Sequence, residues 1–244
     1  YYKLLSPSWK REKIVSSHKY FPNLKYVVCE SQAESYLNHN LPILVCPDSA
    51  QGNVSRVRNW ILDYAGKDDV CIVDDDIKYL GYWEGNTHHK MPSEYTEEFI
   101  ESGFALAKEF GVRLWGVNLV ADKGSFREYT PFSMKSVILG PFGGFTNCDV
   151  RYDEGLPLKE DYDLSLQLTN KYRKVLRINH VHYVCDQHTN KGGCAEYRTI
   201  EAEKDQFVAL EKKWGNKIVH RDGGQSKTGR VRQAAYDINP IIKI

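Results

Sequence analysis

The sequence lacks a long hydrophobic run, a closely spaced cysteine pair, an internal repeat and a low-complexity segment. No stretch approaches the roughly 18 consecutive apolar residues that a transmembrane helix requires, so we expect no membrane partner and a cytoplasmic location. Several cysteines lie in apolar, strand-like runs, which favours buried free thiols in a reducing compartment. The six cysteines are Cys29, Cys46, Cys71, Cys148, Cys185 and Cys194.

Net charge is also small, because 33 Lys and Arg nearly balance 32 Asp and Glu and leave a formal charge of +1. The distribution is uneven, since residues 217–232 contain five basic residues and one acidic residue, which suggests a local anion contact more than general coating of nucleic acid. A chain of 244 residues with 41% hydrophobic content can bury one sizeable core. We therefore expect one domain over residues 1–215 and a basic tail over 216–244 that packs on or near the functional site.

The first half of the chain alternates short apolar runs with a helical pattern, which is typical of βαβ units. We expect strands at Tyr26–Cys29, Leu41–Cys46 and Val70–Val73. Between the last two, apolar residues at helical spacing predict a helix over 53–65, with Asn53 as its N-cap and Gly66 as its end. The pattern predicts further helices at Thr96–Phe110 and Thr199–Trp214, and further strands at Leu114–Ala121, Ser136–Leu139 and Val175–Cys185.

Three consecutive aspartates follow the predicted strand Val70–Val73, at the edge where open α/β sheets bind ligands. Alternate side chains of an extended chain point the same way, so Asp74 and Asp76 can both reach one hard cation while Asp75 faces elsewhere. Such a cation, Mn²⁺ or Mg²⁺, can bridge two phosphates and neutralise a leaving diphosphate. A solvated acidic loop is the alternative for this pattern.

The stretch GNVSRVRNWILDYAGKDDVCIVDDDI resembles the GT-A nucleotide-diphospho-sugar glycosyltransferases, in which a glycine and an Arg-Asn-bearing helix precede a strand and its Asp-x-Asp pair. The resemblance implies an α/β fold, a single GT-A domain with a Rossmann-like mixed central sheet flanked by helices and the donor site at the strand carboxyl ends. It also implies a sugar-transferring enzyme with a nucleotide-sugar donor, UDP-sugar being the expected one. Arg56 and Asn59 lie on one helix face and are expected to reach the donor. Glu30 and Asp75 are further expected donor contacts.

A second block, GPFGGFTNCDVRYDEGLPLKEDYDLSLQL, looks like the acceptor half of the same family. Gly143 and Gly144 are expected to form a turn that lets the acceptor approach the backbone closely. Glu160 and Asp161 open a helix, where the dipole stabilises a carboxylate that can act as general base. We favour Asp161 as the base, which argues for inversion at the sugar carbon. A simple helix N-cap is the structural alternative.

The third block, VHYVCDQHTNKGGC, follows the late strand, where this family often has a histidine that completes the metal site. His188 is the closest positional match, and His182 is the alternative. Lys191 with its neighbouring glycines is expected to cover the diphosphate. A histidine in a loop is otherwise usually a surface residue.

The loop SPSWKRE near the N-terminus resembles the first donor loop of the TET/JBP-associated glycosyltransferases, a GT-A branch linked to modified bases in phage and kinetoplastid DNA. The resemblance implies that Ser8, Trp9 and Arg11 bind the donor, with Trp9 on the nucleobase and Arg11 on phosphate. It also implies a hydroxymethylated pyrimidine in DNA as acceptor and, for a phage protein, the host cytoplasm as location. The expected phosphate contacts in the tail are Arg221, Arg230 and Arg232, with Lys227 beside them.

Other readings remain open at this point. The acceptor can instead be a polysaccharide or a protein. Clustered aspartates also hold metals in nucleases and phosphoryl transferases, and a nucleotidyltransferase is the strongest rival. Such enzymes usually carry a glycine-rich phosphate loop near the first strand, and SPSWKRE is not glycine-rich. A non-enzymatic carbohydrate- or nucleic-acid-binding module would leave Asp161 and the Asp-x-Asp pair without a joint purpose.

Overall fold

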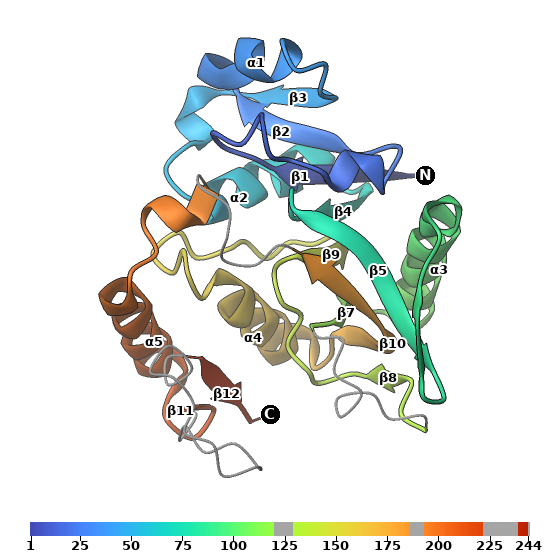
Figure 1. Cartoon of the computed structure of the whole chain (residues 1–244). Coiled ribbons are helices and arrows are strands. Elements are labelled where there is room, and N and C mark those ends of the chain that lie inside the picture. Colours follow the sequence, from blue (N-terminus) through green and yellow to red (C-terminus); the bar gives the residue numbers. More distant parts are fainter. Residues whose placement is uncertain (120–128, 186–192, 222–238, 244) are drawn as a thin grey trace.

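The computed structural model describes residues 1–119, 129–185, 193–221 and 239–243, leaving aside the side chains of residues 194 and 195 (Figure 1). Within these ranges no helix is long and apolar enough to cross a membrane. The strands are β1 (Tyr2–Pro7), β2 (Lys25–Cys29), β3 (Ile43–Cys46), β4 (Asp69–Val73), β5 (Ile77–Glu84), β6 (Thr87–Lys90), β7 (Leu114–Asn118), β8 (Phe132–Ser133), β9 (Phe142–Phe145), β10 (Leu176–Cys185), β11 (Val219–Arg221) and β12 (Pro240–Ile242). The α-helices are α1 (Glu30–Leu37), α2 (Val54–Ala65), α3 (Thr96–Glu109), α4 (Glu160–Tyr172) and α5 (Ile200–Trp214).

One mixed sheet organises the molecule, with the strand order β3-β2-β1-β4-β9-β7-β10-β5-β6 and β8 attached to β10. The pairs β1–β2, β1–β4, β2–β3 and β7–β10 are parallel, whereas β9 is antiparallel to both β4 and β7. Helices cover the sheet on both sides, and two hydrophobic clusters lie between them (Figure 1). The carboxyl ends of β1, β2 and β4 therefore meet at one edge, as the βαβ pattern predicts.

The element predictions are confirmed for most of the chain, including the N-cap of α2, where Asn53 Oδ1 accepts a hydrogen bond from the Arg56 amide. The strand predicted at Ser136–Leu139 is wrong. The backbone N–H and C=O of Ile138 both bond to the hydroxyl of Ser165 on α4, so this segment needs no partner strand. The sequence reasoning also missed the β5–β6 hairpin, which begins directly after the aspartate run.

The cysteine prediction is confirmed for four thiols, because Cys29, Cys46, Cys71 and Cys148 are buried and free. Cys185 is half-buried. Cys29 and Cys46 end the neighbouring strands β2 and β3, and their Sγ atoms are 3.5 Å apart.

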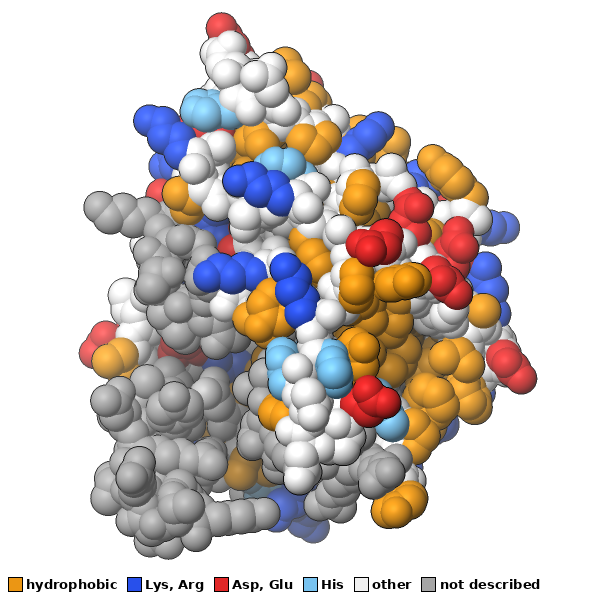
Figure 2. Space-filling view, turned by 45° about the vertical axis from the view of Figure 1, so that its right-hand side comes forward, with side chains coloured by type: hydrophobic (Ala, Val, Ile, Leu, Met, Phe, Trp, Pro, Cys, Tyr) orange, Lys and Arg blue, Asp and Glu red, His pale blue; other side chains and the backbone are white. Residues whose placement is uncertain are grey.

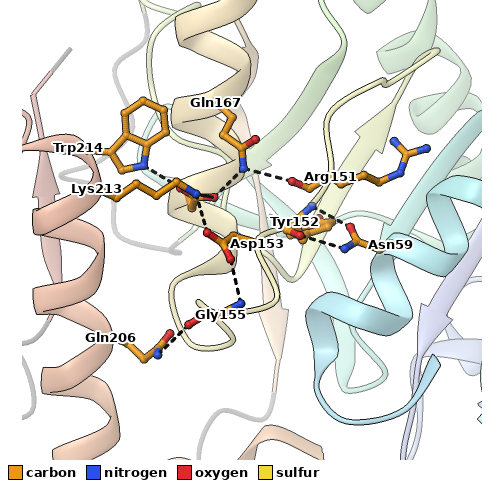
Figure 3. A network of polar contacts seen from close by, with 10 residues as sticks. Asn59, Arg151, Tyr152, Asp153, Gly155, Gln167, Gln206, Lys213 and Trp214 are labelled. Carbon is orange, nitrogen blue, oxygen red and sulfur yellow. Dashed lines mark hydrogen bonds and ion pairs between the residues drawn. The ribbon is translucent and has the colours of Figure 1, made fainter. Parts of the chain in front are cut away.

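Helix α5 contacts α4 through the buried carboxylate of Asp163, whose partners Lys213, Trp214 and Gln167 are labelled in Figure 3. Trp214 Nε1 donates to Asp163 Oδ1 at 2.8 Å, and Lys213 Nζ lies 2.9 Å from the same oxygen. Gln167 Nε2 donates to Asp163 Oδ2 at 2.6 Å. At the same end of α4, the buried N-cap residue Lys159 pairs with Glu203 of α5. These contacts, together with a small apolar cluster, join the last helix to the one that carries Glu160 and Asp161.

The substitution Trp214→Phe tests this connection. Phenylalanine keeps an aromatic ring but removes the donor to a carboxylate that is 0% exposed, so we expect a loss of about 1–3 kcal/mol in the free energy of unfolding. For a chain of this size that corresponds to a fall in Tm of several degrees, roughly 2–4 °C per kcal/mol, measured by calorimetry. The exposed Lys212→Ala in the same helix should stay within about 0.5 kcal/mol of the parent. Equal Tm values for the two variants would contradict the role of this contact.

Candidate functional site

The aspartate run is held in place by its backbone. The Asp74 amide donates to the Pro141 carbonyl at 3.0 Å, and the Ser17 hydroxyl donates to the Asp74 carbonyl at 2.8 Å. The amides of Ser16 and Ser17 both donate to the carbonyl of Asp75. The direction of each aspartate side chain is therefore set by β4 and its neighbours.

Asp75 points into the protein, whereas Asp74 and Asp76 stay at the surface. Asp75 is 3% exposed and accepts hydrogen bonds from Ser8 Oγ and Arg11 Nη1, each at 2.6 Å. The side chains of Asp74 and Asp76 are 31% and 18% exposed. This alternation agrees with the geometry of an extended chain and leaves two carboxylates for one ligand.

The run is crowded with negative charge. Burial raises the pKa of Asp76 to about 7, the charges of Asp74 and Asp75 add to the rise, and Arg11 offsets part of it. A cation bound by Asp76 would relieve this repulsion, and hard oxygen ligands suit Mn²⁺ or Mg²⁺. The residues therefore fit a divalent metal. The described residues contain no group of three or more His, Cys, Asp or Glu side chains that could hold a metal, so a cation on Asp74 and Asp76 would require a further ligand.

Arg58 joins the aspartate run to the first turn of α4. Arg58 as a residue is 2% exposed, and its Nη2 donates to Asp74 Oδ1 at 2.8 Å while Nη1 donates to Glu160 Oε1 at 2.8 Å. Nη2 also donates to the Gly140 carbonyl at 3.2 Å. A buried arginine is tolerated when carboxylates pair with it, and here the two carboxylates come from two different elements.

Glu160 and Asp161 differ in their surroundings. Burial raises the pKa of Glu160 to about 8, Asp161 raises it further, and Arg58 offsets only part of this rise. Asp161 is half-buried; its Oδ2 accepts from the Gly140 amide at 2.9 Å and its Oδ1 from the Tyr162 amide at 2.8 Å. Both lie in the first turn of α4, where the helix dipole favours a negative charge.

The predicted donor loop lies next to the aspartate run, but two of its polar side chains are already engaged. Ser8 Oγ bonds to Asp75 and to the Tyr36 hydroxyl, and Arg11 pairs with Asp75. Trp9 has the ammonium of Lys10 4.2 Å from its ring centroid, and its carbonyl accepts from the Gly193 amide. Glu30 is exposed at the start of α1, at the carboxyl end of β2.

The structure differs from the expectation for Arg56 and Asn59. Arg56 Nη2 donates to the Ser49 carbonyl, and the Asn59 amide bonds to the backbone of Tyr152 in both directions. Neither side chain contacts the aspartates. Arg58, which the sequence analysis did not single out, is the residue of α2 that reaches Asp74.

The turn predicted at Gly143 and Gly144 is also wrong. Both glycines are buried in β9, between β4 and β7. A Cβ at Gly144 would overlap with the indole of Trp115, and Gly143 lines a small internal cavity together with Asp161. These glycines make room for packing within the sheet, so they do not form a surface for an acceptor.

The histidine and tail predictions have different outcomes. His188, Lys191, Arg230 and Arg232, with Lys227, lie outside the described residues. His182 is 2% exposed on β10, and its Nε2 is 2.9 Å from Nε2 of His88, which belongs to the β5–β6 hairpin. His182 pairs with Gly81 in the middle of β5, so it lies away from the aspartates that precede this strand. Arg221 ends β11 with its guanidinium 5.5 Å from the ring centroid of Phe207 on α5.

Comparisons with protein-family models and with curated proteins gave no match. Among solved structures, the chain is similar to glucosyl-3-phosphoglycerate synthase from Mycobacterium tuberculosis in complex with Mn²⁺, UDP-glucose and phosphoglyceric acid, with a TM-score of 0.53, 8% identity, and coverage of 92% of this chain and 81% of that one. It is also similar to the mannosyltransferase PcManGT from Pyrobaculum calidifontis in complex with GDP-Man and Mn²⁺, with a TM-score of 0.54, 11% identity, and coverage of 86% and 64%.

A third similar structure, TarS 1-349 from S. aureus, has 14% identity, and the chain covers 65% of its length. Its TM-score of 0.46 is too low to support a common fold. The first two likenesses show the fold: a mixed α/β domain of the GT-A type, as the resemblance implied.

Proposed function

We propose that the chain is a metal-dependent glycosyltransferase, a hexosyl- or pentosyltransferase that moves a sugar from a nucleotide-diphosphate sugar to an acceptor hydroxyl. The catalytic domain spans residues 1–215, and the expected donor is a UDP-sugar. The GT-A fold supports this class of activity, because the two solved neighbours were bound to UDP-glucose or GDP-Man with Mn²⁺. Fold alone does not define chemistry, so the proposal depends on the site.

One observation carries the proposal, namely the contact of Arg58 with both Asp74 and Glu160. This contact brings the Asp-x-Asp pair and the first turn of α4 to the same place. A structural acidic loop would not need a second carboxylate-bearing helix beside it. A transferase needs both, because the leaving diphosphate and the attacking hydroxyl lie on opposite sides of one sugar carbon.

In this proposal Asp74 and Asp76 hold a Mn²⁺ or Mg²⁺ ion, which supplies neutralisation of the diphosphate when it is bound. Asp161 accepts the proton of the acceptor hydroxyl, and the hydroxyl oxygen forms a bond to the sugar carbon. The bond from that carbon to the diphosphate breaks, and its electron pair leaves with the nucleotide. A single displacement of this kind inverts the configuration. Two backbone amides bonded to Asp161 hold its carboxylate in position.

We propose a hydroxymethylated pyrimidine in DNA as the acceptor. The support is the SPSWKRE loop and the five positive charges between residues 217 and 232. A base inside a duplex has to be extruded at a cost of a few kcal/mol, which phosphate contacts can offset. Acidic side chains gather on the right-hand part of the face in Figure 2, and α3 begins with Glu97 and Glu98. We therefore expect DNA to approach from another side.

Incubation with UDP-sugars and Mn²⁺, with release of UDP as the measurement, tests the enzyme class. Slow hydrolysis of one donor supports a transferase. A chain that binds sugars or DNA but releases no UDP would be a binding module, and release of pyrophosphate from a nucleoside triphosphate would indicate a nucleotidyltransferase.

The acceptor is tested by the salt dependence of binding to hydroxymethylated DNA. Each neutralised phosphate contributes a slope of about −0.9 in log affinity against log salt. Replacing Arg230 and Arg232 by alanine should flatten the slope by about one to two units. Transfer that is independent of salt, or equal activity on a free oligosaccharide, would favour a polysaccharide or protein acceptor.

A further inference from the structure

A polar pocket of about 360 Å³ lies beside the first turn of α4. It is lined by Lys135 and Ser136 from the segment before Gly140, by Tyr162 of α4, by Arg177 of β10, and by Pro240 and Ile242 of β12. Asp161 does not line the pocket itself, but it precedes Tyr162 on α4, and the segment with Lys135 and Ser136 leads to Gly140, whose amide bonds to Asp161.

The lining that the described residues provide carries two cations and no carboxylate. Lys135 is exposed, and Arg177 is half-buried with Nε donating to Asn179 Oδ1 at 2.9 Å. In the described part of the chain neither cation forms an ion pair. Two other arginines with little exposure, Arg11 and Arg58, each have a carboxylate partner.

Among the described residues, no carboxylate compensates the half-buried Arg177 for its lost hydration. Burial lowers the pKa of Arg177, and no charge in the described part of the chain offsets the effect. For Arg58 burial acts in the same direction, but Asp74 and Glu160 raise its pKa well above the usual value. A cation that is partly removed from water is stabilised by an anion brought to it. The pocket therefore has the charge and the unused donors of an anion site.

We propose that this pocket binds a phosphate group of the acceptor, an inference that rests on the proposed glycosyltransferase function. The guanidinium of Arg177 offers a planar fork to phosphate oxygens, and Lys135 adds a point charge. The volume falls in the range of small-molecule sites, roughly 300–1,000 Å³, so it has room for more than the phosphate itself. Binding there would hold the acceptor beside α4, the helix that carries Asp161.

Titration with inorganic phosphate tests the pocket without relying on catalysis. The titration is followed by calorimetry with a chelator present and with ionic strength held constant by chloride. We expect phosphate to bind the parent at least about tenfold more tightly than it binds Lys135→Gln or Arg177→Gln, which corresponds to about 1.4 kcal/mol. Lys25→Gln is the matched control, because Lys25 is an exposed lysine at the start of β2, at the opposite edge of the sheet. It should bind phosphate as the parent does.

Lys135 is exposed, so Lys135→Gln should not disturb the fold. Circular dichroism checks that Arg177→Gln also remains folded. Equal phosphate affinity in the parent and in both folded variants would overturn the proposal. Chloride that binds the pocket as tightly as phosphate does would also overturn the proposal.

The source of the phosphate is tested with three acceptors that share one base: 5-hydroxymethyldeoxycytidine, its 5′-monophosphate and an oligonucleotide that contains it. For the phosphorylated acceptors, Lys135→Gln should raise KM at least about tenfold with kcat little changed, and UDP release without acceptor should stay at the parent level. The nucleoside should show no such change. A preference for the monophosphate identifies a small phosphorylated acceptor, and a preference for the oligonucleotide identifies a backbone phosphate.

Failure of the two proposals can be told apart. If the parent releases no UDP from any donor, the glycosyltransferase proposal fails, whereas phosphate binding that depends on Lys135 and Arg177 still supports the anion site. If UDP release is normal and KM changes equally for nucleoside and nucleotide, the anion site is overturned and the transferase stands.

Discussion

Replacing Asp76 by alanine is expected to reduce transfer at least about a thousandfold, or ~4 kcal/mol of barrier, with little loss of stability. The reason is that Asp76 follows the carboxyl end of β4 and is partly exposed, and a metal ligand in such a position contributes to chemistry more than to packing. The variant also loses a carboxylate from a crowded cluster, so its Tm should not fall. Mn²⁺ affinity, measured by calorimetry, should weaken in parallel with the rate.

The exposed Asp205→Ala on α5 is the control for Asp76→Ala and should keep the parent rate. Activity of Asp76→Ala within about tenfold of the parent, which is only about 1.4 kcal/mol, would remove Asp76 from the metal site. Loss of rate with unchanged Mn²⁺ affinity would do the same, because it would assign another role to this carboxylate.

Asp161→Asn is expected to abolish transfer, by about 10²–10⁴-fold, while binding of the nucleotide-sugar survives. Asparagine has nearly the same shape, but its one carbonyl oxygen can accept from only one of the two backbone amides, Gly140 or Tyr162, so we expect a small loss of stability while the fold is kept. What it cannot do is take a proton from the acceptor hydroxyl. Transfer rates and UDP binding by calorimetry measure the two effects separately.

Asp205→Asn, at an exposed position of α5, is the control and should keep the transfer rate and the UDP affinity of the parent. If donor affinity of Asp161→Asn falls together with its rate, Asp161 belongs to the donor site. In that case Glu160 becomes the next candidate for the base, although its bond to Arg58 has to break before it can act.

Much of the donor half could be predicted from the sequence because its signals are local. Val70–Val73 is a short apolar run after a capped helix, and three aspartates end it, so the strand, its edge and the alternation of the side chains follow from the pattern. The roles of Asp74 and Asp76 as metal ligands and of Asp161 as base stay predictions.

Arg58 shows why the site itself could not be completed from the sequence. The apolar pattern of α2 puts Val54, Val57 and Ile61 on the inward face, but the buried face includes Ser55 and Arg58 with Ile61. Reasoning from periodicity places arginine in solvent. Arg58 is inside only because Asp74 and Glu160 meet there, and Glu160 is 102 residues away in the chain.

The turn predicted at Gly143 and Gly144 is wrong for a similar reason. A Gly-Gly pair is a local signal for a turn, and nothing near it in the sequence indicates a buried strand. The requirement for glycine at position 144 comes from Trp115, a residue of the neighbouring strand β7. Such long-range packing is visible only once the sheet order is known.

The attachment of α5 also limits how this chain can be shortened. A fragment that stops before Ile200 loses Glu203, the partner of the buried Lys159, and the α5 partners of the buried Asp163, both at the start of α4. It also uncovers Leu166, which packs against Phe207. An uncompensated buried charge is strongly destabilising, on the order of 3–5 kcal/mol, and a domain has only about 5–15 kcal/mol in total. The smallest fragment that folds and is suitable for expression must therefore extend through Trp214, even though the aspartate run and Asp161 all lie before residue 162.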